Sequence, residues 1–406
     1  MALKLPVYLD HNATTPVDPT VLDAMMPYLT DKFGNAASRS HPFGWAAEAA
    51  VEEARERLAE ILGAVAKDIV FTSGATESNN LAIKGVAEMY RDRGNHIITC
   101  AAEHKAVIDP CRNLEQRGYE ITWLKPDEFG RVSAQQVADA ITDKTILISI
   151  MAANNEVGTI SPVAAIGEVA KDRGVLFHCD ATQAVGKIPL NVEKMGVDLL
   201  SLSAHKIYGP KGVGALYVRR RSPRVRLTCQ MDGGGHERGM RSGTLNVPGI
   251  VGLGAAATLA AEGMEDEARR LVTLRDRLEN GIREQIDYVK LNGHPIERLP
   301  GTLNLSFAYV EGESLMMKMK DLAVSSASAC TSASLEPSHV LRSMGVPDDL
   351  AHSSIRFSLG RSNDVGQIDY AVEQVANAVT ELRQLSPLYE LAQEGVDIHK
   401  VNWKAD

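Results

Sequence analysis

Short apolar runs alternate with helix-like stretches between about residues 69 and 218, and no other feature of the chain constrains its fold as strongly. The runs predict strands over residues 69–72, 96–100, 119–124, 145–151, 176–180, 199–203 and 214–218. Most are continuously apolar, as expected of strands that helices cover on both faces. We therefore expect an α/β fold with a mostly parallel sheet, in which binding sites form where strands end.

The pattern changes after residue 247. A long helix is predicted over residues 252–285, and another, rich in Ala, Glu and Arg, over residues 46–62 with its end at Gly63. The later part of the chain mixes strands with helices, as in a smaller α+β unit. Its strands are predicted over residues 301–307, 322–325 and 353–359, and its helices over residues 313–320 and 365–385.

This change divides the chain into two predicted domains. We expect a large domain over residues 16–262 and a small C-terminal domain over residues 263–406, which an N-terminal arm, residues 1–15, joins. The tail, residues 387–406, sets apolar residues among charged ones and is interpreted as a partner-docking extension.

The composition is that of a soluble globular protein, with 44% apolar and 23% charged residues. A net charge of -9 argues against direct binding of nucleic acid. The start has no apolar leader and no stretch approaches the length of a membrane span, so no membrane contact is expected. Five cysteines at irregular spacing fit a reducing compartment, and we expect the cytoplasm.

Lys206 follows one apolar strand, and Asp180 ends another. A lysine partly stripped of water has a depressed pKa and can form a Schiff base with a carbonyl. A carboxylate at the end of an apolar strand needs a partner, and pyridoxal phosphate (PLP) offers one in its ring nitrogen. The alternatives are a solvated loop lysine, which is the commoner fate of lysine, and a structural salt bridge between the two residues.

Two further strand ends carry groups that suit the same cofactor. A glycine turn at Gly74 and a helix predicted to start near Thr76 form an anion site, to which the Thr76 and Ser78 hydroxyls could add contacts. His104 could stack on a flat ring and move protons near neutral pH. The alternatives are an ordinary capped turn and a histidine at a helix start without a role.

The predicted small domain contributes a thiol and a guanidinium. Cys330 lies among small residues over 325–334, and a helix starting near Ser338 could help to lower its pKa. The alternating strand 353–359 projects Arg356 as a rigid fork for a carboxylate. The alternatives are a buried structural cysteine and a solvent-facing arginine on an edge strand.

Taken together, these residues resemble a PLP-dependent cysteine desulfurase of the class V aminotransferase superfamily, closest to the housekeeping iron–sulfur-cluster type. The resemblance runs from Tyr8 nearly to the C-terminus, and its most specific stretches are residues 203–212, 238–244 and 328–332. It implies PLP fold type I, with a mostly parallel seven-stranded sheet in the large domain and a smaller α+β C-terminal domain.

The resemblance also implies roles for single residues. Lys206 would hold PLP as a Schiff base and later move protons, while His104 would stack on the ring and assist proton transfer. Asp180 would bind the ring nitrogen and Gln183 the ring hydroxyl. The phosphate ligands would be Ala75, Thr76, Ser203 and His205, with Thr244 reaching in from the neighbouring subunit of an obligate homodimer. Asn155 and Arg356 would hold the substrate carboxylate.

The reaction implied is removal of sulfur from L-cysteine, which leaves L-alanine and a persulfide on Cys330. The persulfide would pass to an iron–sulfur scaffold protein and to other acceptors, for cluster assembly and tRNA thiolation. No resident metal is expected, although Cys330 could transiently ligate a shared iron–sulfur cluster.

Some residues depart from the housekeeping pattern. His11 and Asn12 replace a Tyr-Ser pair and are similar to nitrogen-fixation relatives, residues 245–248 differ, and Ala327 stands where glycine is common. These departures leave the subtype and the choice of partner open. The alternative functions are a selenocysteine lyase, another class V enzyme such as an aminotransferase, and an assembly platform that binds scaffold proteins. Cys330 argues against a plain aminotransferase, which has no use for a second nucleophile.

Overall fold

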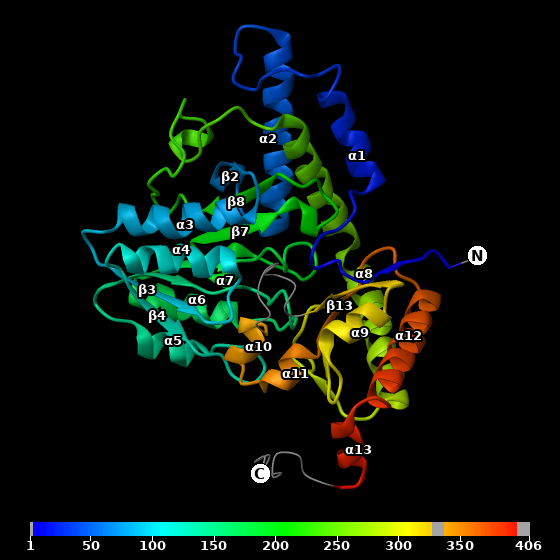
Figure 1. Cartoon of the computed structure of the whole chain (residues 1–406). Helices are drawn as coiled ribbons and strands as arrows, with labels where there is room; N and C mark the ends of the chain where they lie inside the picture. The colour runs from blue at the N-terminus through cyan, green and yellow to red at the C-terminus, as the bar shows by residue number, and fades with distance from the viewer. Residues whose placement is uncertain (1–2, 327–336, 396–406) are drawn as a thin grey trace.

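A computed structural model describes residues 3–326 and 337–395 and contains the expected seven-stranded sheet (Figure 1). Its strand order is β2-β8-β7-β6-β5-β3-β4, and β8 alone runs antiparallel to its neighbours. The strands are β2 (Ile69–Thr72), β3 (His96–Cys100), β4 (Glu120–Leu124), β5 (Thr145–Ser149), β6 (Leu176–Asp180), β7 (Leu199–Ser203) and β8 (Gly214–Val218). The prediction of a mostly parallel sheet is confirmed, although β5 ends two residues before the predicted 151.

Helices cover both faces of this sheet, and alternate strand residues face the two cores. Ile97 packs with α3 (Ala75–Met89) and α4 (Lys105–Gln116), whereas Ile98 packs with α2 (Pro42–Leu62) and α6 (Val163–Arg173). Because both faces are covered, every residue of β3 and β5 is buried, which explains why these strands read as continuous apolar runs. Two shorter helices, α5 (Ala134–Ala140) and α7 (Val192–Met195), complete this part of the chain.

The C-terminal part is built on a four-stranded antiparallel sheet in the order β12-β13-β10-β9. Its strands are β9 (Val289–Leu291), β10 (Thr302–Phe307), β12 (Ser325–Ser326) and β13 (Ser354–Ser358), and its helices are α9 (Gly312–Lys318), α10 (His339–Ser343), α11 (Asp348–His352) and α12 (Val365–Arg383). The strand predicted over residues 322–325 is wrong in one respect. It is split between two sheets, because β11 (Leu322–Ala323) pairs with β1 (Val7–Tyr8) of the N-terminal arm.

One helix links the two parts of the chain. The helix α8 (Val247–Gln285) starts five residues earlier than predicted, with Asn246 as its cap and Pro248 in its first turn. It packs against α1 (Pro19–Met25), α2 and α12 (Figure 1). The predicted domain boundary at residue 262 falls inside α8, and the division into two domains stays a prediction.

The same helix corrects the expectation that no stretch approaches a membrane span. By length and composition α8 could cross a membrane, with an 18-residue window of mean hydropathy 1.3. Since 56% of that window is buried inside the protein, and a core helix passes the same test, this is a weak indication of a membrane segment. In the predicted docking tail, α13 (Pro387–Gln393) has no buried residue.

Candidate active site

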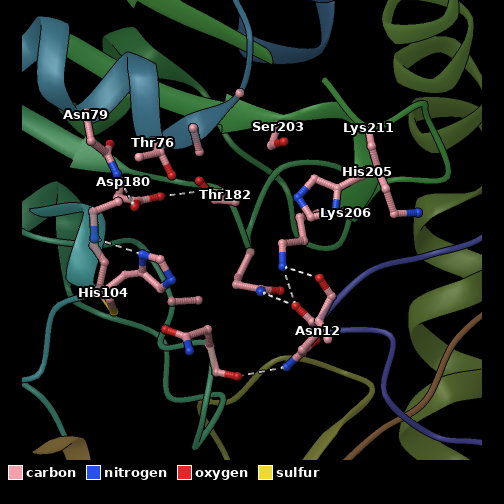
Figure 2. A pocket seen from close by; sticks show the side chains of 18 of the residues that line it. Asn12, Thr76, Asn79, His104, Asp180, Thr182, Ser203, His205, Lys206 and Lys211 are labelled. Atoms are coloured by element: carbon pink, nitrogen blue, oxygen red, sulfur yellow. Dashed lines mark hydrogen bonds between the residues drawn. The ribbon is translucent and has the colours of Figure 1, made fainter. Parts of the chain in front are cut away.

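A cavity of about 810 Å³ lies at the carboxyl ends of the parallel strands, where the four-stranded sheet faces them (Figure 2). The sequence-predicted residues that line it are Ala75, Thr76, His104, Asn155, Asp180, Gln183, Ser203, His205, Lys206 and Arg356. Residues up to 281 positions apart in the chain therefore meet at one site, as expected of strand ends in an α/β sheet. Cys330 lies outside the described residues.

Thr244 does not line this cavity, and it is exposed. The segment before it contains two successive non-glycine residues in the left-handed region, Glu237 (φ 46°) and Arg238 (φ 60°). A buried ion pair between Glu237 and Arg55 (2.7 Å) stabilises this strained backbone. The placement is compatible with a contact to a neighbouring subunit, which stays a prediction.

Lys206 is held by the N-terminal arm. Its Nζ donates to the backbone carbonyls of Asn12 (2.6 Å) and Ala13 (2.7 Å), as Figure 2 shows. The arm itself is fixed beside β7, because Thr15 N donates to the His205 carbonyl (2.9 Å). Sequence reasoning missed Asn12 as a site residue, and the unusual His11-Asn12 pair was the signal that could have found it.

Asp180 ends β6 with its carboxylate turned into the cavity. It accepts hydrogen bonds from Asn79 Nδ2 (2.7 Å) and from the backbone N–H of Thr182 (3.0 Å) (Figure 2). Two neutral donors thus offset the cost of desolvating the carboxylate and leave its negative charge without a cationic partner among the described residues. A protonated ring nitrogen is a suitable further partner. Asn79, which orients Asp180 from α3, was not predicted.

The turn before α3 forms the predicted anion site. Gly74 (φ 152°) caps the helix without a side chain, so the first-turn amides at Ala75 and Thr76, which have no intrahelical acceptor, remain available to a ligand. The expected contact from Ser78 is wrong, because its hydroxyl is buried in a hydrogen bond with Thr72 (2.8 Å) and does not line the cavity. Arg241 and Glu77 pair at the cavity edge (2.8 Å).

His104 caps α4 and faces the cavity. Its Nδ1 accepts the backbone N–H of Ala106 (3.0 Å). Desolvation lowers the pKa of His104, with Asp180 opposing the shift and Lys206 adding to it. His205, which bonds Thr14 Oγ1 through Nδ1 (3.1 Å), has its pKa lowered to about 4, first by burial and then by Lys206. Both rings are therefore neutral at pH 7.

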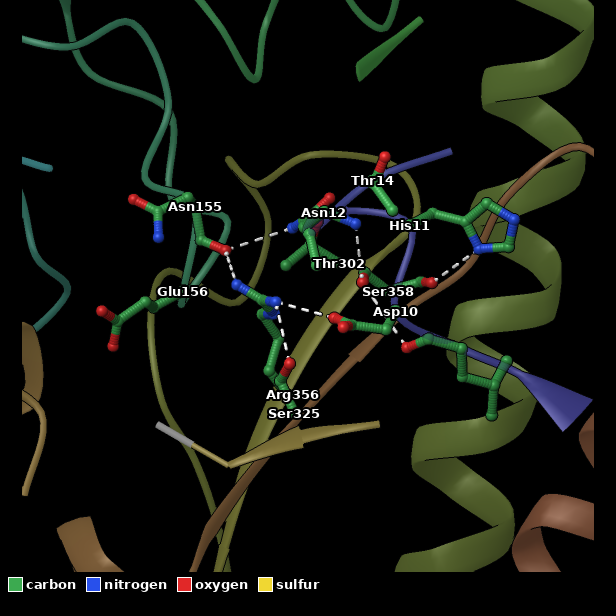
Figure 3. A network of polar contacts seen from close by, with 12 residues as sticks. Asp10, His11, Asn12, Thr14, Asn155, Glu156, Thr302, Ser325, Arg356 and Ser358 are labelled. Atoms are coloured by element: carbon green, nitrogen blue, oxygen red, sulfur yellow. Dashed lines mark hydrogen bonds and ion pairs between the residues drawn. The ribbon is translucent and has the colours of Figure 1, made fainter. Parts of the chain in front are cut away.

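Arg356 belongs to an internal strand, so the alternative of a solvent-facing arginine on an edge strand is excluded. Its guanidinium pairs with Asp10 (2.7 Å) and donates to the Asn155 carbonyl (2.9 Å) and to Ser325 Oγ (3.2 Å) (Figure 3). Its Nε is buried and has no partner among the described residues. Arg356 nevertheless lines the cavity, where a planar guanidinium suits a ligand carboxylate.

A buried carboxyl group beside this fork was not predicted. Glu156 is 4% exposed and accepts a hydrogen bond from Ser338 Oγ (2.5 Å). Burial raises the pKa of Glu156 to about 7, against the opposing effects of Ser338 and Arg356. Ser325 lines the cavity, and Ser338 is fixed beside it by Glu156, so the two described ends of the segment that contains Cys330 both lie near the site.

The residues that line this cavity fit PLP. The site groups a lysine, a carboxylate that no cation of the described residues neutralises and a helix N-terminus that can bind phosphate at the end of a mostly parallel sheet. This combination defines a PLP enzyme of fold type I. More particularly, the chain belongs to the aminotransferase class-V family, whose model matches residues 7–371. Members of this family depend on PLP.

Relatives and solved structures agree with this assignment. The chain is 59% identical over 401 residues to a cysteine desulfurase IscS of Anaeromyxobacter dehalogenans, with 99% of each chain covered. It is 59% identical over 403 residues to a cysteine desulfurase IscS of Aeromonas hydrophila, again with 99% of each covered. Two similar solved structures are a NifS-like protein (TM-score 0.86, 38% identity, covering 93% of this chain and 100% of that one) and SspA in complex with cysteine (TM-score 0.79, 39% identity, 87% and 98%).

Proposed function

We propose that this protein is a cysteine desulfurase, which uses PLP to convert L-cysteine into L-alanine and leaves a persulfide on Cys330. The observation that carries the proposal is the cavity itself, which brings Lys206, Asp180, His104 and Arg356 together. Relatives of 59% identity over nearly the whole chain bear the name cysteine desulfurase. The solved structure of a similar protein with cysteine supports cysteine as the substrate.

Different residues of the cavity would bind different parts of the cofactor. Lys206 would bind its aldehyde covalently, Asp180 its ring nitrogen and Gln183 its ring hydroxyl. The phosphate would lie at the start of α3, on contacts from Ala75, Thr76, Ser203 and His205. When bound, PLP supplies an electron sink for the substrate carbon next to the carboxylate.

The residues of the chain would then orient the substrate and move its protons. Arg356 and Asn155, which both line the cavity, would hold the carboxylate of cysteine. The released amine of Lys206 would take the α-proton, because its Nζ lies in the same cavity. His104 holds a proton at Nε2 and would donate it toward the reacting atoms.

Sulfur transfer requires a thiolate, and we assign that role to Cys330. Its thiolate would attack the cysteine sulfur, so that an S–S bond forms and the C–S bond breaks. The electron pair of the C–S bond stays on carbon, which takes a proton and becomes the methyl group of alanine. Overall, a thiol and L-cysteine give a persulfide and L-alanine, with no external oxidant.

The other cysteines are poor candidates for this step. Burial raises the pKa of Cys100 and of Cys111 to about 12, and it also raises the pKa of Cys179 well above its ordinary value. Cys229 is half-buried, donates to the Met231 carbonyl (2.9 Å) and does not line the cavity. The role of Cys330 itself rests on the sequence.

An exposed apolar patch supports a homodimer. Its residues come from the segment between α1 and the first turn of α2, and they are Leu22 of α1, Met26 of the 3-10 turn η1 (Met26–Tyr28), Leu29 and Phe33 of the following loop, and Phe43 and Trp45 of α2, each 45–67% exposed. Large apolar side chains exposed together in one segment are typical of an interaction site. We assign it to the partner subunit, which would also bring Thr244 to the second active site.

Partners and location follow from the same proposal. The name IscS of the relatives supports delivery of sulfur to an iron–sulfur scaffold protein, for which α13, with no buried residue, offers a docking surface. The four described cysteines are free thiols, which suits the cytoplasm. Among the described residues no cluster of His, Cys, Asp and Glu could hold a resident metal.

The direct test supplies the holoprotein with L-cysteine and a thiol reductant and measures alanine and sulfide. We expect equal amounts from the parent and from a Cys229→Ala control, and neither product from Cys330→Ala. A PLP-containing protein that forms neither product would carry out another class V reaction. Preference for selenocysteine over cysteine in a parallel assay would favour the lyase alternative.

A further inference from the structure

A second lysine, Lys187, has no role in the proposed mechanism but lies next to Gln183 at the active site. Lys187 follows Gly186, whose φ of 72° turns the chain after β6. Its Nζ donates to Gln183 Oε1 (2.7 Å) and to Asn12 Oδ1 (3.2 Å). Lys187 therefore contacts both a predicted cofactor ligand and the arm residue that holds Lys206.

This lysine lies in an unfavourable electrostatic position. Within residues 3–326 and 337–395, no carboxylate oxygen lies within ion-pair distance of its Nζ. Burial, Lys206 and Arg356 lower the pKa of Lys187 to about 7, and the carboxylate of Glu267 opposes them more weakly. An ammonium group with like charges nearby and only amide acceptors does little for stability, which points to a role at the site.

The contacts of Lys187 fix which end of the Gln183 amide faces the ligand. Because the Lys187 Nζ donates to Gln183 Oε1, the carbonyl oxygen of the Gln183 amide faces Lys187. The amide nitrogen then points the other way, where it donates to the Asn12 carbonyl (2.9 Å) beside the cavity. That nitrogen has two N–H groups, and the second can serve a ligand. Gln183 thus presents a donor to the cavity.

The Asn12 side chain is oriented in the same network. Its Nδ2 donates to Thr302 Oγ1 (2.9 Å) and to the Asn155 carbonyl (3.3 Å), so its Oδ1 faces Lys187 (Figure 3 shows Asn12 and Thr302). Its backbone carbonyl accepts from both Lys206 and Gln183. Every contact in the network therefore agrees with one orientation of the two amides, in which Lys187 donates to both.

We propose that Lys187 is a positioning residue for the cofactor, which holds Gln183 so that an amide N–H, and not the carbonyl oxygen, faces the ring hydroxyl of bound PLP. The inference rests on the proposed placement of that hydroxyl beside Gln183. A donor at this place stabilises the ionised hydroxyl, whereas a carbonyl oxygen would stabilise the protonated one. The two forms of lysine-bound PLP absorb at different wavelengths, so the orientation has a spectroscopic signature.

The test compares absorption spectra and PLP affinity without any substrate. In Lys187→Met we expect the short-wavelength band of the protonated form to grow at pH 7, and the dissociation constant of PLP from the apoprotein to rise about five- to tenfold. Lys187→Gln, which keeps an N–H donor without the charge, should stay close to the parent. An exposed lysine in α7 supplies the control, Lys194→Met, which should change neither quantity.

A double variant shows whether Lys187 acts through Gln183. If it does, adding Lys187→Met to Gln183→Ala changes neither the band ratio nor the PLP affinity further. An equal change in both backgrounds, a parental spectrum and affinity in Lys187→Met, or a Lys187→Gln spectrum as altered as that of Lys187→Met would each overturn the proposal. Because no measurement uses cysteine or Cys330, failure here is distinct from failure of the desulfurase assay.

Discussion

The backbone N–H of Ala106 donates to Nδ1 of His104 across 3.0 Å, so the neutral imidazole carries its proton on Nε2. The contact is a helix cap, and it leaves the second nitrogen directed at the cavity. In this state His104 offers the cavity a proton and cannot accept one at Nε2 until that proton has left. The helix start thereby sets the direction of the first proton transfer that His104 itself can make.

One substitution can separate the two roles of His104, which are to cap α4 and to donate a proton. In His104→Asn the side-chain oxygen can still cap α4, so the free energy of unfolding should change by less than about 1 kcal/mol. The variant has no donor at the position of Nε2, and we expect kcat for alanine formation to fall by about 10²–10⁴. Enzyme assays and urea unfolding measure the two effects. Full activity in His104→Asn would remove the imidazole from the proton transfer.

The strand-end residues of this site could be predicted because their signals are local. Each of Asp180, His104 and Lys206 follows an apolar run that marks a buried strand, and parallel strands bring their ends together. The anion site also follows from a local glycine turn, although Ser78 was misplaced. Which side chains of a helix start are buried, as that of Ser78 is, cannot be predicted from so short a segment.

Contacts that close across the chain could not be predicted in the same way. Asp10 meets Arg356 over a separation of 346 residues, and Glu156 meets Ser338 over 182. Lys187 and Asn12 are 175 residues apart. No periodicity or turn in the sequence encodes such pairs, because they depend on how the arm and the four-stranded sheet pack against the larger sheet.

Arg356 should not tolerate lysine. A lysine ammonium cannot replace the planar fork that serves Asp10, Asn155 and Ser325 while leaving a donor for the substrate. In Arg356→Lys we expect KM for L-cysteine to rise about ten- to a hundredfold, with a smaller loss of kcat. Steady-state kinetics measures both. Arg277→Lys, in an exposed ion pair with Asp369, is the matched control and should behave as the parent. A normal KM in Arg356→Lys would contradict the carboxylate role.

His178 should make the fold sensitive to acid. The ring lies between Ser149 Oγ (2.8 Å) and Ser201 Oγ (2.9 Å), and burial lowers the pKa of His178 to about 4, with Asp180 opposing the shift. Between pH 6.5 and pH 4 the unfolded chain binds a proton here that the folded chain does not. Stability is therefore lost as the pH falls, by up to about 1.4 kcal/mol per pH unit.

The measurement compares the parent with His178→Gln by urea unfolding across this pH range. The variant lacks this dependence, so the difference in unfolding free energy between the two proteins should change as the pH falls. The difference is needed because burial raises the pKa of Glu156 to about 7 and of Asp198 to about 6, which stabilises the fold as the pH falls. A difference independent of pH would show that His178 titrates normally in the fold.

The exposed patch on α1 and α2 leads to a prediction about assembly. We expect the parent to sediment at twice its chain mass of 43.9 kDa, and Trp45→Asp, which places a charge at a 53%-exposed residue of the patch, to shift toward the monomer. A charge placed in a buried interface loses its hydration without a partner, which weakens association. Ile296→Asp alters an even more exposed apolar residue outside the patch, and this control should remain dimeric. A parent that sediments as a monomer, or equal behaviour of the two variants, would reject the patch as the dimer interface and would leave Thr244 without an active site to complete.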